Sequence, residues 1–140
     1  MPFSNFDTNA FLRDYWQKQP LLIRGAFGDW ANPLEPDDLF DLASEDHVEA
    51  RLVKQDRERW EAEHGPFTED RFGRLGKLPW TLLVQAVDHH APEVSALLDD
   101  FRFVPNWRID DVMVSYASDG GGVRSEEHTS ELQSHLMISY

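Results

Sequence analysis

Cysteine is absent from this chain of 140 residues. Its absence excludes a disulfide framework, a metal site built on thiolates and a cysteine nucleophile. The redox compartment is left open by this composition, and we take the cytoplasm as the default location.

Long apolar runs are absent as well. No stretch approaches the roughly 20 residues that a membrane-spanning helix needs. The N-terminal residues MPFSNFDTNAF lack the basic start and the apolar core of a signal peptide. We therefore expect a soluble protein that is not exported and that has no membrane partner.

Basic residues are scarce, because 13 Lys and Arg stand against 26 Asp and Glu and leave a net charge of -13. Binding to the phosphates of free nucleic acid needs Lys and Arg surfaces, so we expect no direct nucleic-acid partner. The charge favours a basic protein partner electrostatically. The alternative is that the charge serves solubility alone, which is the explanation that charge by itself favours.

The chain does contain enough apolar material for one folded domain, with 41% hydrophobic and 12% aromatic residues. Helical spacing of the apolar residues predicts helices over 7–19 (N-cap Asp7 or Thr8), after Pro36 (N-cap Asp37 or Asp38), over 78–89 and over 93–101. Short apolar or alternating runs predict strands over 21–25, 47–55, 59–67 and 109–117. The second and third of these strands are expected to form a hairpin through the turn DRER. The mixture predicts an α+β fold.

The strand predicted over 109–117 runs into three consecutive glycines, Gly120, Gly121 and Gly122. Glycine adopts positive φ and lets another backbone or a ligand come close. We therefore predict that these glycines form the lip of an active site. The alternative is a flexible loop between two strands, which is what a glycine-rich turn by itself favours.

Residues 124–140 differ in kind from the sequence before them. Their sequence, RSEEHTSELQSHLMISY, is rich in Ser, Glu and His and does not continue the pattern of the preceding strand. It resembles translated sequencing-adapter DNA. We therefore expect one continuous unit over residues 1–123 and a non-native, disordered tail over residues 124–140.

Four segments together resemble one protein family: YWQKQPLLIRGAF (15–27), HGPF (64–67), WTLLVQAVDHH (80–90) and NWRIDDVMVSYASDGGGV (106–123). They are similar to the N-terminal part of the bacterial ribosomal oxygenases, which are cupin-like JmjC proteins that hydroxylate an arginine of a large-subunit ribosomal protein. The resemblance covers essentially all of residues 1–123, in order. It implies that a mixed helix and strand region leads into the first strands of a double-stranded β-helix, or jelly roll, that is truncated here.

The resemblance also implies Fe(II) and, as co-substrate, 2-oxoglutarate. In the family two histidines and a carboxylate hold the iron, and the first two ligands follow the glycines as Gly-Pro-His-x-Asp. In this chain Val123 is followed by RSE, so the His-x-Asp pair, the distal histidine and the basic residue that anchors 2-oxoglutarate are missing. His128 and His135 do not complete a His-x-Asp pair either. We assign no metal ligand and no catalytic residue in this chain.

One pocket residue is carried over by the resemblance. Ser115 lies on the predicted strand before the glycines and matches a family position whose hydroxyl contributes to the substrate or 2-oxoglutarate pocket. The residues alone leave open the alternative that Ser115 is a small polar residue on a half-buried strand.

Other polar and aromatic residues are expected to be structural. Asp110 and Asp111 are adjacent and so face opposite sides of a strand, which makes them unsuitable as a catalytic carboxylate pair. His89 and His90 end a predicted helix, where histidine interacts well with the helix dipole. The remaining residues expected to be structural are His47, His64, Trp16, Trp80 and Trp107.

The leading hypothesis is that the intact gene product is an Fe(II)- and 2-oxoglutarate-dependent hydroxylase of a basic ribosomal protein, and the resemblance implies a homodimer. The chain as given is expected to be inactive, because it lacks the iron ligands. One alternative is a non-catalytic protein-interaction module that binds through an exposed sheet edge or an apolar helix face. Another is a related cupin-like oxygenase that hydroxylates histidine.

Overall fold

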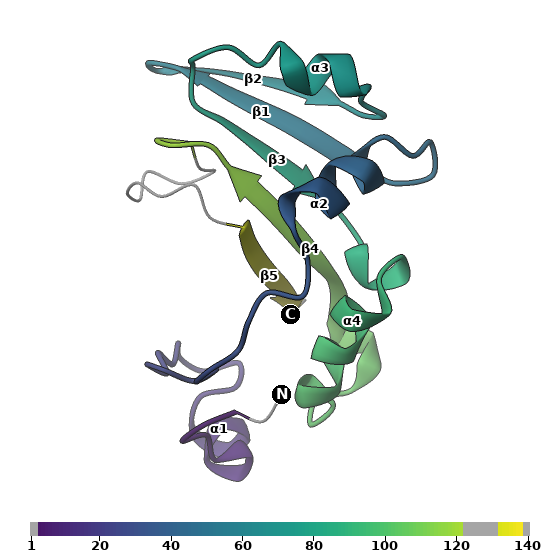
Figure 1. Ribbon diagram of the computed structural model, residues 1–140. Helices are drawn as coiled ribbons and strands as arrows, with labels where there is room; N and C mark the ends of the chain where they lie inside the picture. The colour runs from purple at the N-terminus through teal and green to yellow at the C-terminus, as the bar shows by residue number, and fades with distance from the viewer. Residues whose placement is uncertain (1–2, 122–131, 139–140) are drawn as a thin grey trace.

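The computed structural model describes residues 3–121 and 132–138, and over the second range the course of the backbone alone (Figure 1). Its centre is a five-stranded sheet with the order β2-β1-β3-β4-β5, in which every neighbouring pair is antiparallel. The strands are β1 (Ala50–Asp56), β2 (Arg59–His64), β3 (Trp80–Val84), β4 (Ile109–Ala117) and β5 (Leu132–Ile138).

Short helices accompany the sheet, so the predicted α+β class is confirmed. In Figure 1, α2 and α4 lie beside the middle of the sheet, α3 lies next to the hairpin of β1 and β2, and α1 lies at the opposite end of the molecule from that hairpin. The α-helices are α1 (Thr8–Asp14), α2 (Pro36–Ala43), α3 (Glu69–Gly73) and α4 (Pro92–Ser95). The 3-10 helices are η1 (Val87–His89), η2 (Ala96–Phe101) and η3 (Asn106–Arg108).

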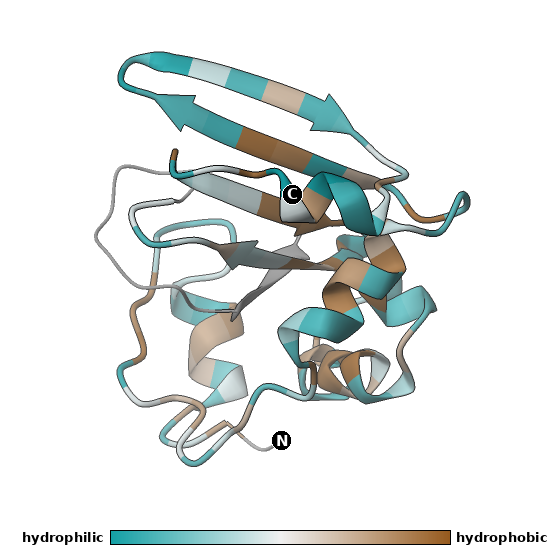
Figure 2. Ribbon diagram, turned by 45° about the horizontal axis from the view of Figure 1, so that its top comes forward, coloured by the Kyte–Doolittle hydropathy of each residue, from teal (hydrophilic) through white to brown (hydrophobic). Residues whose placement is uncertain are grey.

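Three of the four strand predictions are confirmed. Strand β4 has the predicted bounds, and β1 and β2 form the predicted hairpin, which closes where Asp56 faces Arg59. Strand β2 is the outermost strand beside β1, and each of its residues is exposed. Figure 2 shows that the exposed strand β2 is largely hydrophilic, whereas β1 carries a hydrophobic segment.

The first two helix predictions are confirmed, with different ends. Asp7 is the N-cap of α1, and its carboxylate accepts a hydrogen bond from the backbone N–H of Ala10 at 3.0 Å. The helix ends at Asp14 rather than at residue 19. In α2 the N-cap is Glu35 and neither of the two predicted aspartates. The physical reason is Pro36, which suits the first helical position and so makes the residue before it the cap.

The helix predicted over 78–89 is wrong. Residues 80–84 form β3, the central strand, and only Val87–His89 turn into a short 3-10 helix. Strand β3 pairs with β1 on one side and β4 on the other, and its residues from Thr81 to Val84 are all buried. A short run that is apolar on every face does not distinguish a buried helix from a central strand. The helix predicted over 93–101 is present as α4 followed by η2.

The strand predicted over 21–25 is also wrong. Those residues have no regular secondary structure and do not join the sheet. The Leu22 side chain is 73% exposed, so the apolar run is not buried as a strand would require. The correction has a physical reason, since an apolar run becomes a strand only where a partner strand satisfies its backbone.

The core lies on one face of the sheet. Leu52 of β1 and Leu82 of β3 are directly opposite each other, and the next strand adds Val112 and Val114. Helices α2 and α4 cover this face. Their buried residues in the same apolar cluster are Leu39 and Ala43 of α2 and Val94 of α4.

Within the tail that was predicted to be disordered, residues 132–138 form β5 beside β4. The disorder of the rest of the tail lies outside the described residues, and the non-native origin of the tail stays a prediction. The jelly roll also stays a prediction. Among the residues that the structure describes, no helix has both the length and the apolar character to cross a bilayer.

Candidate functional site at strand β4

Ser115, the predicted pocket residue, lies in the middle of the sheet. It sits on β4 opposite Leu83 of β3, and its other register neighbour is Gln133 of β5. Side chains alternate along a strand, so Ser115 faces away from the core side occupied by Val114. It is nevertheless buried, with 3% of its surface exposed. The sheet therefore places Ser115 on its second face, and the role of its hydroxyl in a pocket stays a prediction.

Residues 118–121, which include Gly120 and Gly121, form a turn that is hydrogen-bonded to the start of β3. The N–H and the hydroxyl of Ser118 both lie within hydrogen-bond distance of the Trp80 carbonyl, at 3.0 and 3.3 Å, and the Ser118 hydroxyl accepts the Trp80 N–H at 3.0 Å. The N–H of Gly121 then donates to the Ser118 carbonyl at 2.7 Å. The turn thus fixes the end of β4 against its neighbour.

The structure explains two of the three glycines. Gly120 has φ +75°, the left-handed region that glycine adopts without strain. At Gly121 an added Cβ would lie 2.3 Å from the Trp80 carbonyl oxygen, so only glycine fits. Gly122 lies outside the described residues. Their role as the lip of an active site stays a prediction.

Sequence reasoning missed two buried carboxylates that join β4 to the corner after β3. Asp111 accepts hydrogen bonds from the backbone N–H of Ala86 at 2.7 Å and from the Gln85 amide at 3.1 Å. Asp88 accepts one from the backbone N–H of Val112 at 2.9 Å. The alternation of side chains along a strand could have indicated this role, because it places one of the two adjacent aspartates inside. Asp110 is exposed and its neighbour Asp111 is buried.

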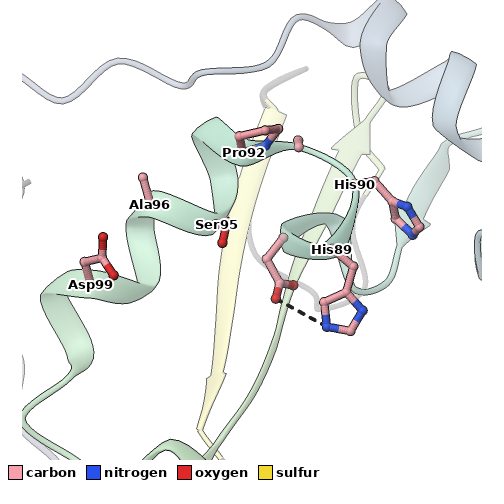
Figure 3. Close-up of a pocket in the computed structure, with 8 residues that line it drawn as sticks. His89, His90, Pro92, Ser95, Ala96 and Asp99 are labelled. Carbon is pink, nitrogen blue, oxygen red and sulfur yellow. Dashed lines mark ion pairs between the residues drawn. The ribbon is translucent and has the colours of Figure 1, made fainter.

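Three histidines, His47, His89 and His90, lie near the same corner. An open hollow of about 480 Å³ is lined by Asp88, His89 and His90 on one side and by residues of α4 and η2 on the other. His89 Nε2 lies 3.6 Å from the Asp88 carboxylate. Figure 3 shows that Ser95 and Asp99 project from the neighbouring helices. The His90 ring lies 5.2 Å from the ring of His47.

These histidines do not make a metal centre. Among residues 3–121, whose side chains the structure describes, no group of three or more His, Asp or Glu side chains is arranged to hold an ion. Iron of the expected type needs two histidines and a carboxylate. The residues present in the described ranges therefore do not fit an Fe(II) site.

Ionisable groups with shifted pKa values lie away from β4. A hydrogen-bonded ion pair joins Arg71 of α3 to Glu63 of β2 through contacts of 2.8 and 2.7 Å. The hydrogen bond from Arg71 holds the pKa of Glu63 below its ordinary value, and the same bond raises the pKa of Arg71. A similar bond from Arg13 lowers the pKa of Asp14 on α1. The first pair joins α3 to β2, whereas the second lies within α1.

Comparison with known proteins shows which proteins the chain resembles. No family model matches the chain. It is 43% identical over 113 residues to the ribosomal protein uL16 3-hydroxylase of Escherichia coli (strain K12), covering 81% of this chain and 30% of the relative. It is 40% identical over 131 residues to a probable ribosomal oxygenase of Haemophilus influenzae, covering 93% of this chain and 32% of the relative.

Solved structures agree with these relatives. YcfD, a ribosomal oxygenase from Escherichia coli, superposes with a TM-score of 0.80 at 40% identity, over 88% of this chain and 34% of that one. A second structure of YcfD, in complex with cobalt and 2-oxoglutarate, superposes equally well over 87% and 33%. The chain thus spans about a third of the length of the proteins that it matches.

Proposed function

We propose that this chain, which is homologous to part of the bacterial ribosomal oxygenases, belongs to a protein hydroxylase that uses Fe(II) and 2-oxoglutarate. The observation that carries the proposal is a TM-score of 0.80 at 40% identity over 88% of the chain. Identity at that level together with a shared fold supports a common chemistry, whereas a shared fold alone does not.

The relatives supply the chemistry of the proposal. The relative from Escherichia coli is a hydroxylase of ribosomal protein uL16, and the ribosomal oxygenase YcfD of that organism has been crystallised with cobalt and 2-oxoglutarate. The described residues of this chain do not fit an iron site. We therefore assign the iron ligands to the part of the complete protein that follows the glycine turn, and we derive no catalytic step from the residues in hand.

For this chain we propose a supporting role at the edge of the pocket. Ser115 contributes its hydroxyl to the 2-oxoglutarate or substrate pocket from the second face of the sheet, where it is buried. Gly120, Gly121 and Gly122 form the lip, because a turn without side chains lets substrate and backbone come close. Both assignments agree with the position of β4 but stay proposals.

The proposed substrate is an arginine of a basic ribosomal protein, uL16 by analogy with the first relative. The net charge of -13 supports this choice, because an acidic surface attracts a basic partner and speeds its encounter. A cytoplasmic location and a homodimer belong to the same proposal.

A first experiment sequences the genomic locus across codon 123 with reads that span it. We expect Gly-Pro-His-x-Asp to follow Val123, which would identify residues 124–140 as non-native. Genomic confirmation of RSEEHTSELQSHLMISY would instead remove the iron ligands and favour the interaction module.

A second experiment tests the activity of the complete gene product. It is incubated with Fe(II), 2-oxoglutarate and a uL16 peptide, and tandem mass spectrometry then locates added oxygen. We expect one oxygen atom on arginine, and none on a matched peptide with lysine at that position. Oxygen on a histidine would favour the related histidine hydroxylase, and the absence of both oxygen transfer and 2-oxoglutarate turnover would refute the oxygenase proposal.

The interaction module keeps one observation in its favour. The side chains of Leu22 and Trp107 are 73% and 74% exposed, and exposed large apolar residues occur where proteins meet. A pull-down of ribosomal proteins that survives loss of all activity would support this second function.

A further inference from the structure

The corner between β3 and η1 holds a residue in an unfavourable backbone conformation. Ala86 follows the strand directly and has φ +49° and ψ +39°. This left-handed region is uncommon for residues that carry a Cβ. Such a conformation persists only where surrounding contacts hold it. The corner therefore needs a fixed partner.

Asp111 of β4 is that partner. Its Oδ2 atom accepts the N–H of Ala86 at 2.7 Å and the side-chain amide of Gln85 at 3.1 Å. The side chain is buried, and hydrogen bonds to an ionised acceptor in such a place are stronger than those between neutral groups. Its other oxygen, Oδ1, is buried and has no partner among the described residues.

Asp88 makes the reverse contact. It belongs to η1 on the far side of the corner, and its Oδ1 atom accepts the N–H of Val112 in β4 at 2.9 Å. Its side chain is 6% exposed, and its second oxygen lies 3.6 Å from Nε2 of His89. The pairing of β4 with β5 is irregular between Ile109 and Val112, so Asp88 satisfies a backbone donor where the ladder is disturbed.

The hydrogen bonds made by Asp111 and Asp88 connect β3 to β4 beyond the last paired residues of the two strands. Cross-strand pairing stops at Val84 and Val114, and the two aspartates join the chains after that point. At the opposite end of the ladder, Ser118 is hydrogen-bonded to Trp80. Ser115 lies between these two fastenings.

We propose that Asp88 and Asp111 form a reciprocal clamp, here called the aspartate clamp, in which each carboxylate accepts a backbone N–H from the other's segment. The clamp holds the left-handed corner at Ala86 and fixes β4 against β3. Its residues are positioning residues for Ser115 and the glycine turn. The clamp itself stands on contacts in this chain, and only its effect on catalysis rests on the proposed function.

The reciprocal arrangement of the two aspartates predicts how the two backbone amides respond to substitution. If the two carboxylates act as one unit, removing either should loosen both backbone amides, because each contact holds the geometry that the other needs. If they are two separate caps, removing one should loosen its own amide alone. Amide hydrogen exchange of Ala86 and Val112, measured by NMR on the full 140-residue chain, distinguishes these outcomes.

We expect Asp111→Ala to raise the exchange rate of the Ala86 amide about tenfold or more, as loss of a hydrogen bond to a charged acceptor implies. The Val112 amide should accelerate as well, and Asp88→Ala should produce the reverse pattern. Asp111→Asn keeps an acceptor oxygen and should restore most of the protection. Acceleration confined to the amide whose own acceptor was removed would overturn the clamp, and so would equal loss of protection in the Asn and Ala variants.

Alanine at either position could prevent folding, so Asp111→Asn and Asp88→Asn serve as the milder pair. In these variants each amide should keep most of its protection, and any remaining acceleration should appear at both Ala86 and Val112. Acceleration confined to one of the two amides overturns the proposal. In the complete gene product, Asp111→Ala should raise the KM for 2-oxoglutarate several-fold more than it lowers kcat, with recovery in Asp111→Asn. An inactive complete protein would count against the proposed function, while the exchange data would still decide the clamp.

Discussion

Gly121 shows how one residue sets the approach of two strands. Its missing Cβ leaves room for the Trp80 carbonyl, which an alanine methyl would meet at 2.3 Å. The carbonyl belongs to the backbone, and the backbone also fixes the position of a Cβ. Neither group can therefore turn away as the end of a flexible side chain could. The glycine is therefore a packing requirement of the β3–β4 joint as well as a proposed part of the lip.

We predict that Gly121→Ala lowers the free energy of unfolding by about 1–3 kcal/mol, the usual cost of overpacking. Urea denaturation followed by circular dichroism measures it. Gly73→Ala is the matched control, because a Cβ at Gly73 has no atom within 4 Å and no positive φ opposes it. An equal effect of both substitutions would show that the contact with Trp80 is not the cause.

Strand β3 shows how an element is decided by its neighbours. Its residues Leu82 and Leu83 are next to each other in sequence yet both are buried, which fits a strand with cover on either face and equally fits a buried helix. Backbone pairing with β1 and β4 settles the matter, and pairing is a property of distant segments.

We predict that Leu82→Ala destabilises the protein by about 2–5 kcal/mol, because it empties space at the centre of a fully buried cluster. The control is Leu22→Ala, whose side chain is largely exposed and should change stability by no more than about 0.5 kcal/mol. Thermal and urea denaturation of the two variants make the comparison. Similar losses in both would contradict the placement of 21–25 outside the core.

Helix α3 is attached to the hairpin through Glu63 and Arg71. Because the pKa of Glu63 is lowered in the folded protein, the pair stabilises the fold above the unfolded carboxyl pKa, about 4.3, and this contribution is lost as the pH falls below it. We predict that Glu63→Gln costs about 0.5 kcal/mol at pH 7, a value typical of exposed pairs. The difference from the parent should shrink as the pH falls below the unfolded carboxyl pKa.

A double-mutant cycle with Arg71→Gln isolates this pair. The two single substitutions and the double one should cost nearly the same at pH 7, since each removes the same contact. Additive losses would mean that Glu63 and Arg71 act through other partners.

At the scale of the whole molecule, the described residues form a sheet with one covered core face and with a buried serine on the other face. They do not provide an iron site. The proposal that the iron ligands follow the glycine turn therefore assigns different roles to different segments. The described residues form the sheet around β4, and a later segment of the complete protein holds the metal.

We predict that the 140-residue chain binds no Fe(II) stoichiometrically, whereas the complete gene product binds one equivalent per chain. Anaerobic calorimetric titration of both proteins measures the difference. Stoichiometric binding by the 140-residue chain would contradict the assignment of the ligands to a later segment.

The sequence by itself determined those features that depend on local pattern. The short run of β-branched and aromatic residues over 109–117, with turn formers on both sides, predicted β4. The turn DRER predicted the hairpin, and four segments carried the resemblance to the ribosomal oxygenases. Absence of cysteine and scarcity of basic residues excluded whole classes of site without any knowledge of the fold.

Only the tertiary structure decided what depends on a distant partner. It made 80–84 a strand, because β1 and β4 lie on either side, and it left 21–25 irregular, because no strand lies beside them. It also brought Asp88 to the backbone of β4 and Asp111 to the corner at Ala86. A carboxylate accepts a hydrogen bond from whichever N–H the fold places within about 3 Å, and no local sequence pattern predicts which N–H that is.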